Sequence, residues 1–148
     1  LLRPGGVTVG QLEGAIGKID TDPSVEHNVQ VKKASSPGMK YKHYSPSCKV
    51  ILVHSSGERF AEFVKQSAGQ NDAAMCFDED ADKISIPVIT LGKAEDSAAH
   101  AHRLFAALRL ADEGGYDTVY AHCPKVDGVG LAVFNRLVRA AGFDERWL

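Results

Sequence analysis

The sequence predicts an α/β protein with a mainly parallel sheet, and two observations lead to this fold class. Short apolar runs alternate with amphipathic helical patterns between residues 49 and 148. Because a parallel connection needs a crossover of helix length, this alternation favours parallel strands with helices on both faces. Residues 34–48 have no helical or strand period, and their Ser, Pro, Gly and Lys residues are typical of an irregular linker. The expected fold is therefore a Rossmann-like sheet preceded by a linker that packs little.

The first elements follow from spacing and capping residues. Thr8 is a candidate N-cap for a short helix over residues 8–17, whose apolar residues recur at helical spacing. Residues 50–53 are all apolar, which predicts a strand buried on both faces. A helix over residues 57–69 follows, and strands are expected in residues 73–78 and 84–92. Pro87 places the latter at a sheet edge, because proline cannot donate to the ladder.

The last elements repeat the same pattern. Ser97 is the expected cap of a long helix over residues 97–115, which Gly114 and Gly115 end. A strand in residues 117–124 and a helix over residues 129–142 complete the unit. The apolar residues expected to face inward from the two helices are Ala101, Leu104, Phe105, Leu108 and Ala111, then Leu131, Phe134, Val138 and Ala141.

The composition of the 148 residues, 44% hydrophobic and 24% charged, is that of one small globular domain with appendages. No apolar run approaches the roughly 18 residues of a membrane span, and the first residues do not resemble a signal peptide. The three cysteines, Cys48, Cys76 and Cys123, form no CxxC pair. We therefore expect no membrane association, reduced thiols of which Cys76 and Cys123 are buried, and a cytoplasmic location.

Charge is distributed unevenly along the chain. Residues 27–57 contain no Asp or Glu but five lysines, which favours an anionic partner there. Seven acidic residues lie between positions 70 and 96, and they are expected to form a solvated surface, because their spacing matches no metal-binding loop. We expect no metal site.

Known chemical motifs are mostly absent. The sequence contains no GxGxxG after its first strand, no P-loop and no GxSxG, so NAD binding and hydrolase activity are disfavoured. Residues 127–130 open the last helix and suit either an anion at its N-terminus or, preferably, a turn eased by glycines. Two weaker sets of ligand candidates remain. They are His54 and His122 at strand ends, and Asn135, Arg136 and Arg139 on the polar side of the last helix.

The linker segment SSPGMKYKHYSP is the most distinctive part of the sequence. Lys40, Tyr41, Lys42, His43 and Tyr44 are consecutive, without a period that would place them in a core. Ammonium groups attract phosphate, and a phenol can stack on a base or hydrogen-bond. The segment suits a lid over a phosphorylated, base-containing ligand, and an arm that binds nucleic acid would look similar.

Four segments resemble the C-terminal half of the two-domain threonylcarbamoyl-AMP synthases, also called L-threonylcarbamoyladenylate synthases. They are LRPGGVT (2–8), SPGMKYKHYSP (36–46), LGKAED with LFAALR (91–96 and 104–109), and GVGLAVFNRLVRAAG (128–142). The resemblance implies three parts: residues 1–33 end a YrdC-type catalytic domain, residues 34–48 form a basic linker, and residues 49–148 form the C-terminal Rossmann-like domain.

The resemblance also implies a function for the parent enzyme. Such enzymes make threonylcarbamoyl-AMP from ATP (with Mg²⁺), L-threonine and bicarbonate, and the product serves the modification of tRNA to threonylcarbamoyladenosine. It implies nucleotide contacts for Arg3 and Tyr41, and weaker lid contacts for Lys40, His43 and Tyr44. The expected partners are the chain's own YrdC-type domain and the downstream tRNA-modification machinery.

No catalytic residue is expected in this chain itself, which would be inactive and bind no cofactor alone. A stand-alone nucleotide- or RNA-binding α/β module without catalysis is the alternative.

Overall fold

The computed structural model describes residues 1–22 and 45–148. In chain order the elements are α1 (Val9–Ile16), β1 (Lys49–His54), α3 (Gly57–Ser67), β2 (Ala73–Cys76), α4 (Asp78–Ala81), β3 (Val88–Thr90), α5 (Ser97–Glu113), β4 (Thr118–His122), α6 (Gly130–Ala140) and β5 (Glu145–Trp147).

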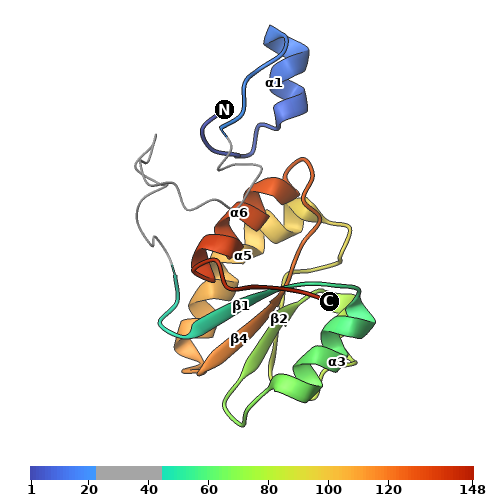
Figure 1. The fold of residues 1–148 in the computed structure, drawn as a ribbon, viewed down its shortest axis with the longest axis vertical. Helices are drawn as coiled ribbons and strands as arrows, with labels where there is room; N and C mark the ends of the chain where they lie inside the picture. The colour runs from blue at the N-terminus through green and yellow to red at the C-terminus, as the bar shows by residue number, and fades with distance from the viewer. Residues whose placement is uncertain (23–44) are drawn as a thin grey trace.

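The strands form one five-stranded sheet in the order β3-β2-β4-β1-β5, and every neighbouring pair is parallel. The longest pairing joins β1 to β4, from Lys49 opposite Thr118 to Val53 opposite His122. Helix α3 covers one face, and α5 and α6 cover the other (Figure 1). The predicted fold class, a parallel α/β sheet with helices on both faces, is confirmed.

Each face of the sheet has its own apolar cluster. Alternate residues of β1 divide between them, because successive side chains of a strand point to opposite faces. Val50 and Leu52 pack with α5 and α6, whereas Ile51 and Val53 pack with α3. Most of the side chains expected to face inward do so, but Ala101 is exposed and Phe105 and Leu131 are half-buried.

Two local expectations are confirmed by the contacts of the residues concerned. Thr8 caps α1: its Oγ1 accepts from the Gln11 backbone N–H at 3.2 Å, while the Gln11 side chain accepts from the Thr8 N–H at 2.9 Å. This reciprocal pair is a capping box. Pro87 immediately precedes β3, which is the edge strand next to β2.

Three details differ from the expectations. Asp96, rather than Ser97, caps α5, and its carboxylate accepts from the Ala99 N–H at 2.9 Å. Helix α4 and strand β5 were not expected, because α4 has four residues and β5 three, and neither contains an apolar run. Such short elements form through tertiary pairing and leave no periodic pattern in the sequence.

The turn after α6 directs the chain into β5. Gly142 adopts φ 60°, and its N–H donates to the Arg139 carbonyl at 3.0 Å. The Phe143 N–H donates to the Val138 carbonyl at 2.9 Å, which completes a Schellman motif. Leu52 then receives the returning chain through a 2.9 Å bond from its N–H to the Asp144 carbonyl.

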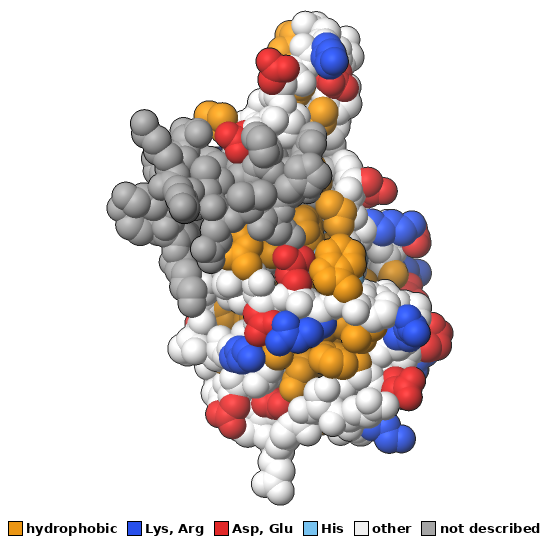
Figure 2. Space-filling view, in the orientation of Figure 1, with side chains coloured by type: hydrophobic (Ala, Val, Ile, Leu, Met, Phe, Trp, Pro, Cys, Tyr) orange, Lys and Arg blue, Asp and Glu red, His pale blue; other side chains and the backbone are white. Residues whose placement is uncertain are grey.

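The N-terminal segment has almost no core of its own. Helix α1 contains no buried residue, and the side chains of Val7 and Ile16 are 58% and 73% exposed. Hydrophobic side chains are visible at the surface of this segment, at the top of Figure 2. Among residues 1–22 and 45–148, no helix is long and apolar enough to cross a membrane.

We predict that Leu137→Ala lowers the free energy of unfolding by about 2–5 kcal/mol, because Leu137 of α6 is fully buried and its loss leaves a cavity. Leu110→Ala on α5 is the matched control, since Leu110 is 51% exposed and should cost less than about 1 kcal/mol. Urea denaturation followed by circular dichroism measures both. Equal losses would contradict this assignment of the core.

Candidate functional site

Arg3 is the one nucleotide-site candidate that lies in the described part of the chain. Tyr41, Lys40, His43 and Tyr44 lie outside the described residues. Arg3 is exposed and lies close enough to α6 for its charge to act on Arg139. The pKa of Arg139 is lowered, first by burial and then by the charges of Arg136 and Arg3. Arg3 and Arg136 are thus the two cations whose charges act on Arg139.

A second contact supports this placement of the N-terminal segment. A Cβ atom built on Gly128, in the loop before α6, would lie 3.9 Å from Thr8 Cγ2. Figure 1 shows α1 beyond the end of the α/β unit that carries α6. The segment that bears Arg3 thus lies beside α6 and the loop that precedes it.

The last residues of the linker are fastened to α5 and α6. The Ser47 N–H and hydroxyl both donate to Asp112 Oδ1 at 2.6 Å, and these bonds lower the pKa of Asp112. The Ser45 hydroxyl donates to the Arg139 carbonyl at 3.5 Å, and Pro46 is buried. The expectation that the linker packs little is therefore wrong for residues 45–48, although they form no helix or strand.

The start of α6 is a close-packed turn. Gly128 has φ 44°, and a Cβ atom on Gly130 would lie only 2.0 Å from the Lys125 carbonyl oxygen. Glycine suits the positive φ at position 128, and only glycine leaves room for the Lys125 carbonyl at position 130. This geometry supports the simpler expectation for residues 127–130, a turn eased by glycines.

The sequence suggested that Asn135 lies on the polar side of α6, but the structure buries it. It is 4% exposed, its Nδ2 donates to the Leu131 carbonyl at 3.2 Å, and its Oδ1 accepts from Arg139 Nη1 at 3.1 Å. Its amide is compatible with burial because the helix backbone and Arg139 satisfy it. Asn135 thereby orients Arg139, while Arg136 is exposed.

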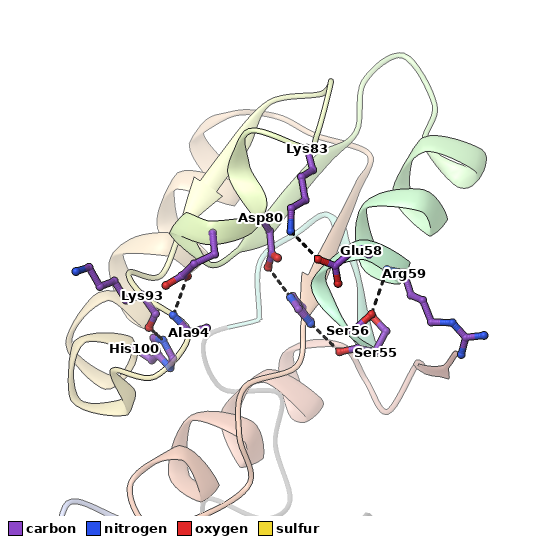
Figure 3. A network of polar contacts seen from close by, with 11 residues as sticks. Ser55, Ser56, Glu58, Arg59, Asp80, Lys83, Lys93, Ala94 and His100 are labelled. Carbon is purple, nitrogen blue, oxygen red and sulfur yellow. Dashed lines mark hydrogen bonds and ion pairs between the residues drawn. The ribbon is translucent and has the colours of Figure 1, made fainter.

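His122 lies at the carboxyl ends of the strands, where open α/β sheets bind ligands. Its Nδ1 is 2.7 Å from Asp80 Oδ2, its Nε2 is 3.0 Å from the Ser55 carbonyl oxygen, and Phe60 stacks on the ring. Figure 3 labels Asp80 and Ser55, the two residues whose oxygen atoms contact the ring nitrogens. Both ring nitrogens are engaged by the protein itself, so His122 joins the loops after β1 and β2.

Gly57, in the first turn of α3, has a role in this arrangement. A Cβ atom there would lie 2.1 Å from Asp80 Oδ1, so the Asp80 carboxylate packs directly against the helix N-terminus. A helix N-terminus stabilises negative charge. The Asp80–His122 pair is therefore stabilised by the Ser55 carbonyl oxygen, which contacts His122, and by the N-terminus of α3, which contacts Asp80.

His54, the other strand-end histidine, also has partners within the protein. Its Nε2 is 2.7 Å from Glu145 Oε2, and its ring stacks on Trp147 with centroids 3.6 Å apart. These contacts tie the end of β1 to β5. The expected crevice role of the two histidines gains no support from this geometry.

The acidic segment is only partly the solvated surface expected. Asp72 and Asp80 are 6% and 4% exposed, which corrects the expectation for these two. Asp72 accepts from the Gly69 N–H at 2.7 Å and the Thr118 N–H at 3.0 Å, which satisfies its buried carboxylate. The other acids of the cluster, Asp78, Glu79, Asp82, Glu95 and Asp96, are exposed as expected.

The cysteines have environments that favour the protonated thiol. Burial raises the pKa of Cys76 and Cys123 to about 12, with smaller contributions from nearby carboxylates. Burial also raises the pKa of Cys48. Since the thiolate is the reactive form, none of the three has a nucleophile's environment. Cys76 is buried as expected, whereas Cys123 is half-buried. Within the described ranges, no group of three or more His, Cys, Asp or Glu side chains could hold a metal ion.

The sequence predicts Arg136 and Arg139 on the polar side of the last helix, and it gives no sign that the charge of Arg3 acts on Arg139. One signal could have singled them out: residues 128–142 contain no Asp or Glu. Two arginines three positions apart on a helix, without an acidic neighbour on it, make a surface of one sign.

Comparison with known proteins gives one family along almost the whole chain. Residues 7–142 match the family described as threonylcarbamoyl-AMP synthase, C-terminal domain. The chain is 37% identical over 145 residues to the threonylcarbamoyl-AMP synthase of Bacillus subtilis, and 34% identical over 152 residues to that of Pyrococcus abyssi. These matches cover 96% and 97% of the chain but only 41% and 42% of the two relatives.

Solved structures agree with the sequence matches. The crystal structure of Pyrococcus abyssi Sua5 complexed with L-threonine superposes with a TM-score of 0.76 at 34% identity. The match covers 100% of this chain and 44% of that one. A variant of the same protein with a histidine and a tyrosine replaced by alanine gives the same TM-score at 32% identity. The chain spans less than half the length of the relatives it matches.

We predict that Asp80→Ala lowers the free energy of unfolding by about 3–5 kcal/mol, because it leaves the His122 ring buried without its carboxylate partner. Asp78→Ala is the matched control on the same short helix. Asp78 is exposed, so its loss should cost less than about 1 kcal/mol. Urea titration at neutral pH checks both, and similar losses for the two variants would contradict the structural role assigned to the pair.

Proposed function

Because the chain belongs to the family of threonylcarbamoyl-AMP synthase C-terminal domains, we propose that it is the regulatory, linker-bearing part of an L-threonylcarbamoyladenylate synthase. The parent enzyme converts ATP, L-threonine and bicarbonate to threonylcarbamoyl-AMP and pyrophosphate. ATP enters with Mg²⁺ as a substrate. The product serves a cytoplasmic tRNA-modification machinery that forms threonylcarbamoyladenosine at position 37.

The observation that carries the proposal is the extent of the match. The similarity runs from the N-terminal segment through the last helix, and it leaves more than half of each relative unmatched. The unmatched part is where the groups that hold threonine and ATP belong. This chain therefore supplies the linker and the domain behind it, and its N-terminal YrdC-type domain supplies the catalysis.

The exposure of α1 supports the proposal that the N-terminal segment is the end of a larger domain. Of the apolar stripe on α1, Val9 and Leu12 are only half-buried and Ile16 is largely exposed. An amphipathic helix gains most of its stability from burying such a stripe. Residues 1–33 thus suit the end of a catalytic domain whose remaining part covers α1.

The proposed nucleotide contacts are Arg3 from this segment and Tyr41 from the linker, with Lys40, His43 and Tyr44 as further lid residues. The anchoring of Ser45 and Ser47 on the last turns of α6 and α5 is consistent with a lid that the C-terminal domain holds at one end. The domain regulates the enzyme by fixing where this linker returns.

We predict that the 148-residue chain alone releases no pyrophosphate above background from ATP, threonine and bicarbonate. Orientation of the reactants supplies most of the rate in such a reaction, and the orienting groups lie in the catalytic domain. The chain joined to its YrdC-type domain should release pyrophosphate under the same conditions, which is the positive control. Turnover by the isolated chain would refute the proposed division of labour.

In the assembled enzyme, we predict that Tyr41→Ala raises the KM for ATP or lowers kcat by about tenfold or more, since a buried contact to a ligand is worth about 1–3 kcal/mol. Lys40→Ala is the comparison on the neighbouring residue. An exposed cation contributes long-range attraction, so its effect should be smaller and confined to low ionic strength. Pyrophosphate release across a salt series measures both. An unaffected Tyr41→Ala would show that the linker is only a tether.

A further inference from the structure

We call Arg3, Arg136 and Arg139 the arginine cluster, because the charges of Arg3 and Arg136 both act on Arg139 although Arg3 comes from a distant segment of the chain. Arg136 and Arg139 lie one turn apart on α6, and Arg3 approaches from the segment before α1. The Arg136 guanidinium lies over the Phe105 ring at 4.9 Å, which holds it against the surface of α5. The cluster therefore lies where the N-terminal segment, α5 and α6 adjoin.

The cluster has no carboxylate partner among residues 1–22 and 45–148. Elsewhere in these ranges, three lysines and one arginine pair with acids: Lys49 with Asp144, Lys83 with Glu58, Lys125 with Glu95, and Arg146 with Asp144. The exposed Arg59 of α3 also has no ion pair there, which makes it a matched control for the cluster. Burial together with the charges of Arg136 and Arg3 lowers the pKa of Arg139. Three like charges that repel one another in the absence of an acid are stabilised when an anion binds among them.

Arg139 is held in one orientation before any anion arrives. Its Nη1 donates to the Asn135 carbonyl at 3.2 Å and to Asn135 Oδ1 at 3.1 Å. In the described part of the chain, Nε and Nη2 have no acceptor, and the residue is only half-buried. A guanidinium fixed through one nitrogen, with its other donors available, is pre-organised for two-point binding of phosphate oxygens.

A simpler explanation accounts for one of these arginines. A cation in the last turn of a helix interacts favourably with the helix dipole, and Arg139 occupies the last turn of α6. That effect does not explain a second and third cation of the same sign, from another turn and another segment. Nor does it explain why a buried asparagine orients the Arg139 fork.

We propose that Arg3, Arg136 and Arg139 together bind an oligophosphate, either inorganic pyrophosphate or the terminal phosphates of a nucleotide. The chemical class follows from the guanidinium groups themselves, because each guanidinium can bind two phosphate oxygens and linked phosphates offer several. The identity of the nucleotide rests on the proposed function, in which Arg3 contacts ATP. The C-terminal domain then contributes two side chains of α6 to the phosphate site.

The test titrates the 148-residue chain with inorganic pyrophosphate, followed by ³¹P NMR and isothermal calorimetry. We expect a dissociation constant of about 1 mM or lower. Arg3→Gln, Arg136→Gln and Arg139→Gln should each weaken binding about tenfold. Arg139→Lys should recover only part of the affinity, because a lysine keeps the charge but loses the planar fork. Because Arg136 is exposed, Arg136→Gln should leave the domain folded, so a loss of binding in this variant cannot be attributed to misfolding.

The matched control is Arg59→Gln, an exposed arginine on α3 at the opposite face of the sheet, which should leave binding unchanged. Absence of pyrophosphate binding to the unaltered chain at about 10 mM would overturn the proposal. So would an equal loss in Arg59→Gln, or binding of polyuridylate that depends on these arginines without binding of pyrophosphate.

The outcomes also separate this inference from the proposed function. An assembled enzyme that forms threonylcarbamoyl-AMP, with a chain that does not bind pyrophosphate, would refute the phosphate site alone. Arginine-dependent pyrophosphate binding, with an assembled protein that makes no threonylcarbamoyl-AMP, would refute the function and leave the site standing.

Discussion

Parallel pairing of all five strands is the constraint on which the rest of this domain depends. Parallel neighbours must be joined by crossovers, which place helices over the sheet and bury both faces. They also bring all carboxyl ends to one edge. The loops that leave this edge carry polar groups into a buried place, and each group must find a partner inside the protein. At this edge, the buried ring of His122 is satisfied by its contacts with the Asp80 carboxylate and the Ser55 carbonyl oxygen.

Much of this fold could be predicted from the sequence, because the signals are local. The apolar run of β1, the stripes of the helices, Thr8 as a cap and Pro87 at an edge all depend on near neighbours in the chain. The burial of Asp72, Asp80 and Asn135 could not be read this way. Asp72 accepts from Thr118 and Asp80 contacts His122, partners that are distant in sequence, whereas the amide of Asn135 is satisfied within α6 and is buried by the packing of that helix. Strand β5 likewise forms only through its hydrogen-bonded pairing with β1, which is distant in sequence.

The candidate site shows the same division between local and distant information. The resemblance assigned Arg3, whereas the basic and aromatic residues of the linker already suited a lid over a phosphorylated ligand, although no periodicity explains them. The arginines of α6 look like a solvated helix face until the N-terminal segment is placed beside them. Like charges then accumulate without acids in the described part, and that accumulation is a property of the assembled surface. A motif search reads residues in order, so it does not find a cluster built from opposite ends of the chain.

The position of β1 has a consequence for how the chain folds during synthesis. The first strand of the α/β unit lies between β4 and β5, so both of its hydrogen-bonding partners are the last strands to be made. While the ribosome translates the residues between them, the apolar strand β1 has no partner on either edge. Such non-local pairing slows folding and leaves the nascent chain dependent on protection from aggregation. Chaperone demand in this domain therefore falls mainly on its earliest strand.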